Sequence, residues 1–315
     1  MQPLSDNFFL SIVIPVYNEQ ETLPELYKRI TTALHGSAIQ KYEIIFVNDG
    51  SVDFSSQLIT TWNQSNSKVK LLELSRNFGQ QTAYTAGIDH ALGDVVVLMD
   101  GDLQDPPEII PKLISQWKEG YEIVYVIRSS RKENWFKRVA FTSFYRLLNK
   151  MSSVPMPLDA GIFSLIDKRV AQLFKAMPER NRYISGLRSW VGFRQIGIPC
   201  EREKRFSGNP RQTLNRLILL AMDGIFSFSY LPLRISALIG FLISVISFIG
   251  ALVAITLRLF NILSIPLGWA SLIVSITFLC GLVLLMLGIQ GEYVARIYEE
   301  VKARPQYIIK SKIGF

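Results

Sequence analysis

The strongest constraint on the fold of this chain is a pair of long apolar runs in its last third. No charged residue occurs from Ile235 to Leu257, and none occurs from Leu259 to Gly291. A helix needs roughly 20 apolar residues to cross the hydrocarbon core of a bilayer, so each run is long enough to span it. A buried helix of a soluble protein is the alternative, and two such runs in succession argue against it. We therefore predict two transmembrane helices within residues 231–291.

Basic residues lie on the outer sides of both runs. They are Arg205, Arg211, Arg216 and Arg234 before the first run, and Arg296, Lys302, Arg304, Lys310 and Lys312 after the second. The short connection between the runs carries only Arg258 at its edge. Because cytoplasmic segments carry the excess of Lys and Arg, we predict a multi-pass protein of the cell inner (plasma) membrane with both termini in the cytoplasm.

Charge and residue counts narrow the chemistry. The net charge of +8 suits an anionic partner. Anionic lipid headgroups and phosphorylated substrates explain it better than nucleic acid, because no compact basic stripe or nucleic-acid motif is present. The chain has only two histidines and two cysteines, and one of these, Cys280, lies inside the second apolar run. A zinc site, a serine–histidine triad and a disulfide framework are therefore poorly supplied, and the chemistry must rest on carboxylates.

The region before the apolar runs alternates short β-branched segments with segments of helical spacing. We predict strands over 10–15, 43–47, 69–74, 94–99 and 122–126, and helices over 21–34, 55–63, 81–91 and 107–119. This alternation predicts an α/β fold with a mostly parallel sheet wrapped by helices. Ligands of such sheets bind at the carboxyl ends of the strands, so the residues that follow each strand are the candidate site.

The fourth predicted strand leads directly into a cluster of carboxylates. Asp100, Asp102 and Asp105 fall within six residues. Oxygen ligands of this kind suit Mg²⁺ or Mn²⁺, which commonly bridge carboxylates to substrate phosphates. A solvated acidic turn ahead of a helix has the same composition, because acidic residues are favoured at helix N-termini. The short Asp-x-Asp spacing alone does not separate these two interpretations.

Polar, turn-forming residues follow the other strands as well. The first strand leads to Tyr17-Asn-Glu19, the second to Asn48-Asp-Gly-Ser51, and the third to Ser75-Arg-Asn-Phe-Gly79. Each alone fits an ordinary turn or helix cap. Four successive strand ends with such chemistry favour a shared binding site.

These motifs together resemble a known family. The segments Ser11–Glu19, Val47–Ser51 with Asp53, Arg76–Gly79 and Asp100–Glu108 look like those of family 2 glycosyltransferases, which have the GT-A fold. Within that family the chain resembles polyisoprenyl-phosphate glycosyltransferases, the relatives of dolichyl-phosphate mannosyltransferase. The segments Gln290–Tyr298 and Arg304–Tyr307 are similar to the two-span bacterial members that glycosylate undecaprenyl phosphate. One departure is Asn48, where many members carry Asp.

The resemblance implies a site for a nucleotide sugar and a metal ion. It assigns Asp100, Asp102 and Gln104 to Mg²⁺ or Mn²⁺ and the donor diphosphate, and it assigns Pro15, Tyr17, Glu19 and Asp49 to the nucleoside. UDP-glucose is the expected donor, because two-span relatives often use it. The implied reaction is an inverting transfer of one sugar to a polyisoprenyl phosphate.

The resemblance also implies residues near the acceptor. The segment Leu158–Phe163 matches the region that brings a carboxylate, here Asp159, beside the acceptor. Because a phosphate is already an anion, positioning by Asp159 is favoured over proton abstraction. A helix cap is the structural alternative for this residue. Arg205 begins Arg205-Phe-Ser-Gly208, which resembles a mobile loop that closes over the donor, where its charge would stabilise the leaving diphosphate.

Two segments have the spacing of helices that lie in a membrane interface. They are residues 135–151 and the juxtamembrane residues 211–230. Helices packed on the protein core would show the same pattern. Arg128, Arg131 and Arg138 precede or begin the first segment, and their guanidinium groups are candidates for the lipid phosphate, with solvated surface arginines as the alternative.

We therefore predict a GT-A catalytic domain over residues 1–210, the juxtamembrane helix over 211–230, two transmembrane helices over 231–291 and a cytoplasmic tail over 292–315. Apolar faces on the interfacial and spanning helices could pair in a homo-oligomer. A processive polysaccharide synthase is one rival, but the nearest candidate for its usual Gln-x-x-Arg-Trp segment, Leu187–Trp190, does not fit. A non-catalytic subunit that binds or translocates lipid is the other rival.

Overall fold

The computed structural model describes residues 7–37, 39–128, 160–180, 182–200, 231–260 and 268–315. The chain forms two compact units, which are described separately. One unit contains the N-terminal region together with Arg304–Phe315, and the other contains Leu217–Ala303. The interfacial segments predicted at 135–151 and 211–230 both lie outside the described residues.

An eight-stranded sheet forms the centre of the first unit, with the order β7-β5-β6-β4-β1-β2-β3-β8. The strands are β1 (Leu10–Val16), β2 (Tyr42–Asn48), β3 (Val69–Leu74), β4 (Val95–Leu98), β5 (Ile123–Arg128), β6 (Ala160–Asp167), β7 (Gln195–Cys200) and β8 (Ile309–Ile313). Among the described strands, only β6 and β8 run antiparallel to their neighbours, so the others end at one edge. We call this edge, with the loops that leave it, the strand-end edge.

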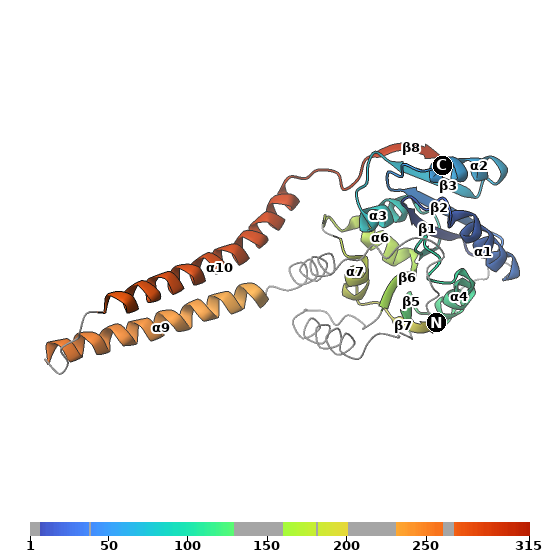
Figure 1. The fold of residues 1–315 in the computed structure, drawn as a ribbon. Coiled ribbons are helices and arrows are strands. Elements are labelled where there is room, and N and C mark those ends of the chain that lie inside the picture. The colour runs from blue at the N-terminus through green and yellow to red at the C-terminus, as the bar shows by residue number, and fades with distance from the viewer. Residues whose placement is uncertain (1–6, 38, 129–159, 181, 201–230, 261–267) are drawn as a thin grey trace. The chain divides into compact units, whose positions relative to one another are not determined.

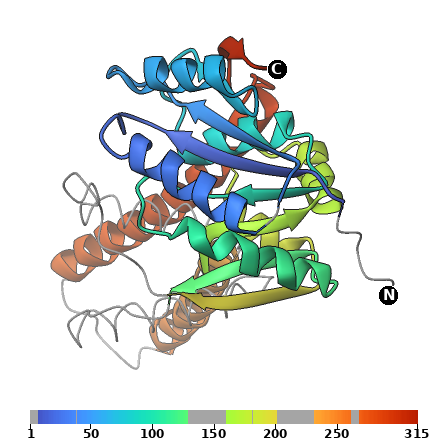
Figure 2. The same ribbon diagram turned by 90° about the vertical axis from the view of Figure 1, so that its right-hand side faces the viewer.

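Helices cover both faces of the sheet (Figure 1). They are α1 (Leu23–Gly36), α2 (Ser55–Ser65), α3 (Gln80–His90), α4 (Ile110–Lys118) after the short 3-10 helix η1 (Pro107–Ile109), α6 (Lys168–Ala176) and α7 (Ile184–Trp190). The side chains of α1 and α4 join the apolar cluster on one face, and those of α3, α6 and α7 join the cluster on the other. Figure 2 shows the first face, with α1 in blue and α4 in green in front of the strands.

The sheet confirms the predicted mostly parallel α/β fold, and β1 to β5 lie where the sequence predicts strands. The last residues of the chain, which fall in the predicted cytoplasmic tail, include a further strand. Residues Ile309–Ile313 form β8, which pairs antiparallel with β3 at the sheet edge (Figure 1). The segment binds there through side chains as well, because Tyr307 donates a hydrogen bond to Asp89 at 2.9 Å and Ser311 donates one to Glu73 at 2.5 Å.

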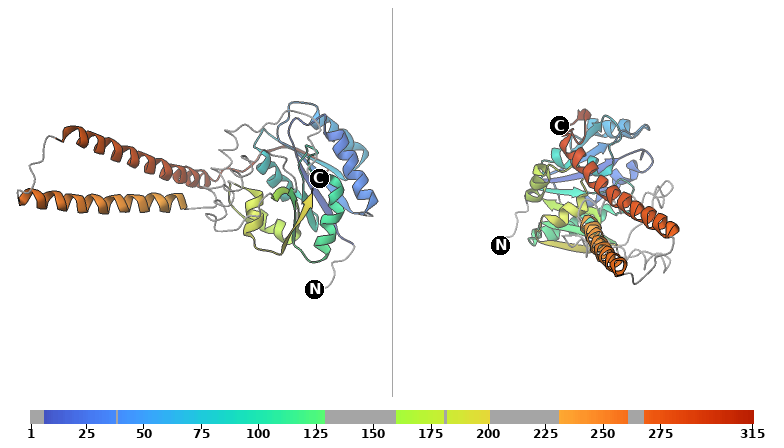
Figure 3. Two further views of the ribbon diagram at one scale, coloured as in Figure 1. Left: turned by 60° about the horizontal axis from the view of Figure 1, so that its bottom comes forward. Right: turned by 90° about the vertical axis from the view of Figure 1, so that its left-hand side faces the viewer.

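The second unit contains the two apolar helices, α9 (Leu231–Leu259) and α10 (Trp269–Val301). They form an antiparallel hairpin, with Gly240 close to the Met286 side chain (Figure 3). Two stretches, Leu231–Gly250 and Val274–Val301, are long and apolar enough to cross a membrane, each with mean hydropathy 2.1. Large apolar side chains such as Phe241 and Leu284 are exposed, which is unlike the buried helix of a soluble protein.

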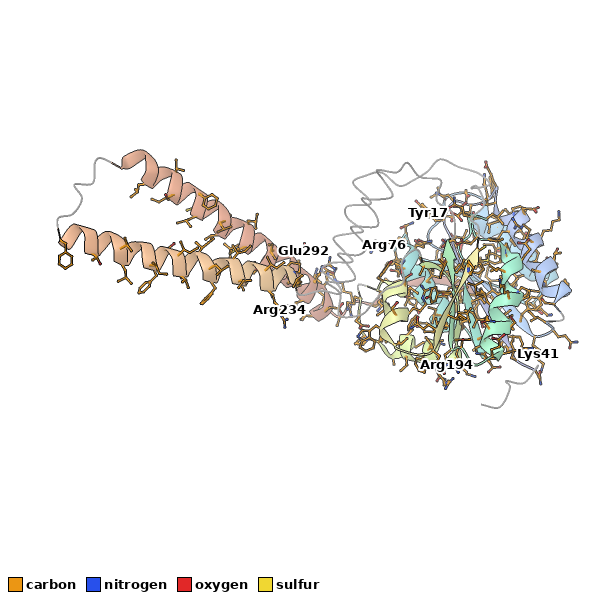
Figure 4. The ribbon with its side chains drawn as sticks, turned by 90° about the horizontal axis from the view of Figure 1, so that it is seen from below. Tyr17, Lys41, Arg76, Arg194, Arg234 and Glu292 are labelled. Carbon is orange, nitrogen blue, oxygen red and sulfur yellow. The ribbon has the colours of Figure 1, made fainter. Side chains whose placement is uncertain are left out.

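Helix α10 continues beyond the predicted end of the second span at residue 291. Its last turns carry charged residues, with Arg296 bonded to Glu292 at 3.2 Å and Lys302 bonded to Glu299 at 2.8 Å. Spacings of three and four residues bring such pairs together on one helix face. Arg234 near the start of α9 and Glu292 in α10 lie at the same end of the hairpin (Figure 4).

Candidate functional site

The loops that leave β1 to β4 meet at the strand-end edge. Tyr17 and Arg76, which follow β1 and β3, lie on this side of the domain, whereas Lys41 and Arg194 precede β2 and β7 and lie at the opposite side (Figure 4). Parallel strands bring successive loops to one edge because every crossover returns the chain to the same starting side. The structure thus brings the predicted donor residues of these loops into one region.

Hydrogen bonds join the first two loops. The Asn18 backbone N–H donates to the Ser51 hydroxyl at 3.0 Å, and the Asn18 side chain accepts from the Val52 backbone N–H at 2.9 Å. Asn18 has a positive φ of 53°, a conformation that Asn tolerates better than most residues. The Glu19 carboxylate accepts from the Thr22 hydroxyl at 2.8 Å at the start of α1, so this acidic group is fixed in place.

Asp49 links the second loop to the third. Its two carboxylate oxygens accept the backbone N–H groups of Phe78 at 2.7 Å and Gly79 at 2.9 Å. Burial raises the pKa of Asp49, and the two N–H donors and the nearby Arg76 counteract part of that rise. Asp49 therefore shapes the loop that precedes α3, in addition to the nucleoside role that the sequence predicts for it.

Gly50 permits these two loops to approach. Its φ is +73°, and a Cβ at this position would lie 2.7 Å from both the Arg76 carbonyl carbon and the Asn77 nitrogen. Any side chain would force the loops apart, so only glycine fits.

The acidic turn after β4 lies against the β1 loop. A Cβ on Gly101 would lie 3.1 Å from the Pro15 carbonyl oxygen, so the small residue keeps the two loops in contact. The turn closes when the Asp102 carboxylate accepts the Gln104 backbone N–H at 3.1 Å. Leu103, with φ 58°, is 2% exposed and anchors the turn in the apolar core. Asp100 and Asp102 are left half-buried beside Pro15.

Two side chains of α3 bind Asp100. The Tyr84 hydroxyl and the Gln80 amide both donate to the same carboxylate oxygen, Oδ1, each at 2.6 Å. Tyr84 is fully buried, and its pKa is raised well above the ordinary value by burial first and then by Asp100, Asp105 and Asp102. The three carboxylates therefore act on one hydroxyl, which shows that negative charge gathers at this turn.

This arrangement fits a divalent cation completed by a substrate. Within the described residues, no three Asp, Glu, His or Cys side chains form a metal site by themselves. Mg²⁺ and Mn²⁺ are usually bound through one or two carboxylates, with waters and substrate phosphates as the remaining ligands. Asp100 and Asp102, held in one tight turn, supply such a pair, and Gln104 lies on the same turn.

The predicted acceptor residues are only partly described. Arg128 is the last residue of β5 and pairs with Cys200 of β7, which places its backbone at the strand-end edge. Arg131, Arg138, Asp159 and Arg205 lie outside the described residues. Ala160 and Gly161, directly after Asp159, begin β6 at the same edge.

Sequence reasoning missed Gln80 and Tyr84. The sequence predicts the helix over 81–91, but its helical spacing does not single out a tyrosine among Ala83, Thr85 and Ala86. A sequence signal for Tyr84 is its bulky side chain with a hydroxyl group, which stands among small residues of a helix that follows a predicted site loop. Its partner could not be named, because Asp100 lies 16 positions away.

The chain is similar in sequence to a known family and to individual known proteins. The model of the family described as "Glycosyl transferase family 2" matches residues 11–174. The protein named uncharacterized glycosyltransferase YkcC, of Bacillus subtilis, is 42% identical over 312 residues, covering 99% of this chain and 96% of its own length. The SfII prophage-derived bactoprenol glucosyl transferase of Shigella flexneri is 41% identical over 305 residues, covering 96% of this chain and 97% of its own.

A solved structure with similarity is the mannosyltransferase PcManGT of Pyrobaculum calidifontis in complex with GDP-Man and Mn²⁺. It is 14% identical, with a TM-score of 0.48, and the match covers 95% of this chain and 88% of that one. The family model matches this chain, and the two relatives are similar to it along nearly its full length. The chain therefore belongs to glycosyl transferase family 2.

Proposed function

We propose that this protein transfers one glucose from UDP-glucose to undecaprenyl phosphate, the lipid also called bactoprenol phosphate. The observation that carries the proposal is the 41% identity over 305 residues to a bactoprenol glucosyl transferase, which extends through both apolar helices. Similarity to a relative that shares only the catalytic domain would carry no information about the acceptor. Similarity that includes the membrane part supports a lipid acceptor.

In this proposal the strand-end edge holds the donor. Pro15, Tyr17, Glu19 and Asp49 bind the nucleoside, on the first two loops. Asp100, Asp102 and Gln104 hold Mg²⁺ or Mn²⁺, which when bound supplies positive charge to the donor diphosphate. The contact between Gly101 and Pro15 supports this division, because it puts the acidic turn beside the loop proposed for the nucleoside.

The transfer follows from the charges of the reactants. A phosphate oxygen of the lipid attacks the anomeric carbon of glucose as the bond to the UDP oxygen breaks, and the anomeric centre is inverted. The lipid phosphate is already an anion, so Asp159 positions it and need not remove a proton. Arg128, Arg131 and Arg138 bind the lipid phosphate, and Arg205 stabilises the charge that develops on UDP.

The pairing of β8 with β3 supports the predicted topology. β3 precedes both apolar helices in the chain and β8 follows them, yet the two strands share one sheet. Both ends of the hairpin must therefore be on the same side of any membrane it crosses, which requires an even number of crossings. The basic residues at both ends favour the cytoplasmic face of the inner membrane for that side.

The test is a reconstituted transfer reaction. Purified protein with Mn²⁺, a panel of nucleotide sugars and undecaprenyl phosphate should form a glycolipid whose mass shows one hexose, with UDP-glucose as the best donor. Absence of glycolipid across the whole panel would rule the proposal out. A product that carries a polymer would favour the rival processive synthase.

A further inference from the structure

Arg188 is the largest fully buried side chain in the described part of the chain, with 1% of it exposed. It lies on α7, where Nη1 donates to the Gly161 carbonyl oxygen of β6 at 2.9 Å. The guanidinium carbon lies 4.7 Å from the centre of the Tyr125 ring of β5. A charged group so deeply buried is normally paired with an anion, because removal from water costs several kcal/mol.

The remaining donors of Arg188 have no such partner. Nε and Nη2 are both buried, and neither makes a hydrogen bond within the described part of the chain. The neighbours that favour the charged form are Tyr183 and Tyr125, and burial lowers the pKa to about 10, so the group is still a cation at neutral pH. Among the described residues, no carboxylate neutralises it.

The unpartnered edge has the geometry that grips an oxyanion. Elsewhere in this protein, Arg29 uses its own Nε and Nη2 to bind both oxygens of the Glu108 carboxylate, each at 2.7 Å. These two donors are parallel in the planar guanidinium, which is why arginine binds carboxylate and phosphate groups in a bidentate manner. Arg188 holds the same pair of donors in place, and neither donates to a described residue.

Arg188 also lies near the strand-end edge. Gly161 follows Ala160, which pairs with Ile127 near the end of β5, so the start of β6 lies at the strand-end edge. Helix α7 is fixed at its start, where the Ile184 backbone N–H donates to the Gln81 side chain at 2.9 Å. Gln81 follows Gln80, which binds Asp100.

We propose that Arg188 binds a phosphate group of a substrate through Nε and Nη2. This inference rests on the proposed function, which supplies two sources of that group: the diphosphate of the nucleotide donor and the phosphate of the lipid acceptor. The neighbouring backbone and ring hold the guanidinium in position before the substrate arrives, so little side-chain entropy is lost on binding.

The test compares ligand affinity with stability in the full-length protein. Affinity for UDP with Mn²⁺ and affinity for undecaprenyl phosphate in detergent are each measured by calorimetry for the parent, Arg188→Met and Arg188→Lys. Arg169→Met is the matched control, because Arg169 is a surface arginine paired with Asp167 and Glu122 at the opposite edge. A charge-assisted contact predicts a loss of about 10- to 100-fold for Arg188→Met in one of the two affinities.

The affinity that falls identifies the source of the phosphate. Arg188→Met should keep the thermal stability of the parent or exceed it, because it removes an unpaired buried charge. Arg188→Lys keeps the charge but loses the two parallel donors of the guanidinium, so its ligand affinity should fall too. This variant provides the test if the methionine variant does not fold. Unchanged affinity for both ligands, or a fall in kcat alone, would overturn the inference. A parent that binds neither ligand would instead refute the proposed function.

Discussion

The two faces of the catalytic sheet bury different kinds of side chain. Under α1 and α4 the interior is mostly apolar, with residues such as Ile12, Ile44 and Phe46 fully buried. Under α3 and α7 the interior includes Tyr84, which reaches Asp100, and Arg188, which reaches Gly161. We call them the apolar face and the polar face. One face of the sheet therefore contributes mainly to stability, and the other holds charged groups at the strand-end edge.

The largest effect should come from the acidic turn that the polar face supports. Asp102→Ala should lower glucosyl transfer by about 10³-fold, since loss of the proposed metal ligand would remove several kcal/mol of charge stabilisation. Glycolipid formation measures this, and the fold should be intact because Asp102 is only half-buried. Glu119→Ala, an exposed change beyond α4, is the control. Full activity in Asp102→Ala would favour the rival non-catalytic subunit.

A substitution on the apolar face should act on stability instead. Phe46→Ala should lower the free energy of unfolding by about 3–5 kcal/mol, because it leaves a cavity in a fully packed core. Limited proteolysis of the full-length protein measures the loss, and the fraction that is still folded should bind UDP as the parent does. A selective loss of UDP affinity without a loss of stability would contradict the division of roles between the two faces.

Removal of the Tyr84 hydroxyl tests whether the polar face positions Asp100. Tyr84→Phe keeps the ring in its core position but removes a donor to Asp100, so the apparent affinity for Mn²⁺ should fall about 10- to 100-fold. Manganese titration of the protein with UDP measures it. Tyr27→Phe is the control on the apolar face, where the Tyr27 hydroxyl only accepts from Asn66 at 3.1 Å. Equal Mn²⁺ affinity in the two variants would show that Tyr84 does not position the carboxylate.

The smallest effect should come from the β8 edge. Burial acts to raise the pKa of Glu73, but hydrogen bonds from Ser311 and Ser56 and the charge of Lys310 outweigh it, so the pKa is below its ordinary value of 4.5. The resulting stabilisation is present above pH 4.5 and is lost as the pH falls through the lowered pKa of the folded state.

Ser311→Ala should cost about 1–2 kcal/mol near neutral pH, because it removes a hydrogen bond to an ionised group. Its Tm should approach that of the parent as the pH falls below the lowered pKa of Glu73, since both proteins then carry a protonated Glu73. Thermal melts at pH 7 and at steps below pH 4.5 test this. A difference in Tm that does not change with pH would show that Glu73 is not the group stabilised by Ser311.

Much of the first half of the sheet was predictable, because its strands are short β-branched runs separated by turn signals. The acidic turn after β4 was predictable for the same reason, since its position followed from the strand before it. β8 was not predicted, although Ile309, Ser311 and Ile313 alternate with lysines as an edge strand does. An alternating pattern names a strand but not its partner, and β3 is distant in the sequence.

The polar face was the hardest part to predict. Arg188 lies in a short helix, where an arginine ordinarily faces water, and nothing in its neighbours indicates burial. Its environment depends on Tyr125 and Gly161, which come from two other strands. Such contacts arise only when the complete fold brings distant segments together, so sequence periodicity cannot reveal them.

The late position of β8 in the chain has a consequence for synthesis. β3 is complete within the first 74 residues, whereas β8 leaves the ribosome only after both apolar helices. At translation rates of 5–20 residues per second, the open edge of β3 waits roughly 10–50 s for its neighbour. If the hairpin fails to insert with both ends on one side of the membrane, β8 cannot reach that edge. A hairpin inserted with its two ends on opposite sides would therefore leave β3 with an exposed strand edge of the kind that chaperones and proteases recognise.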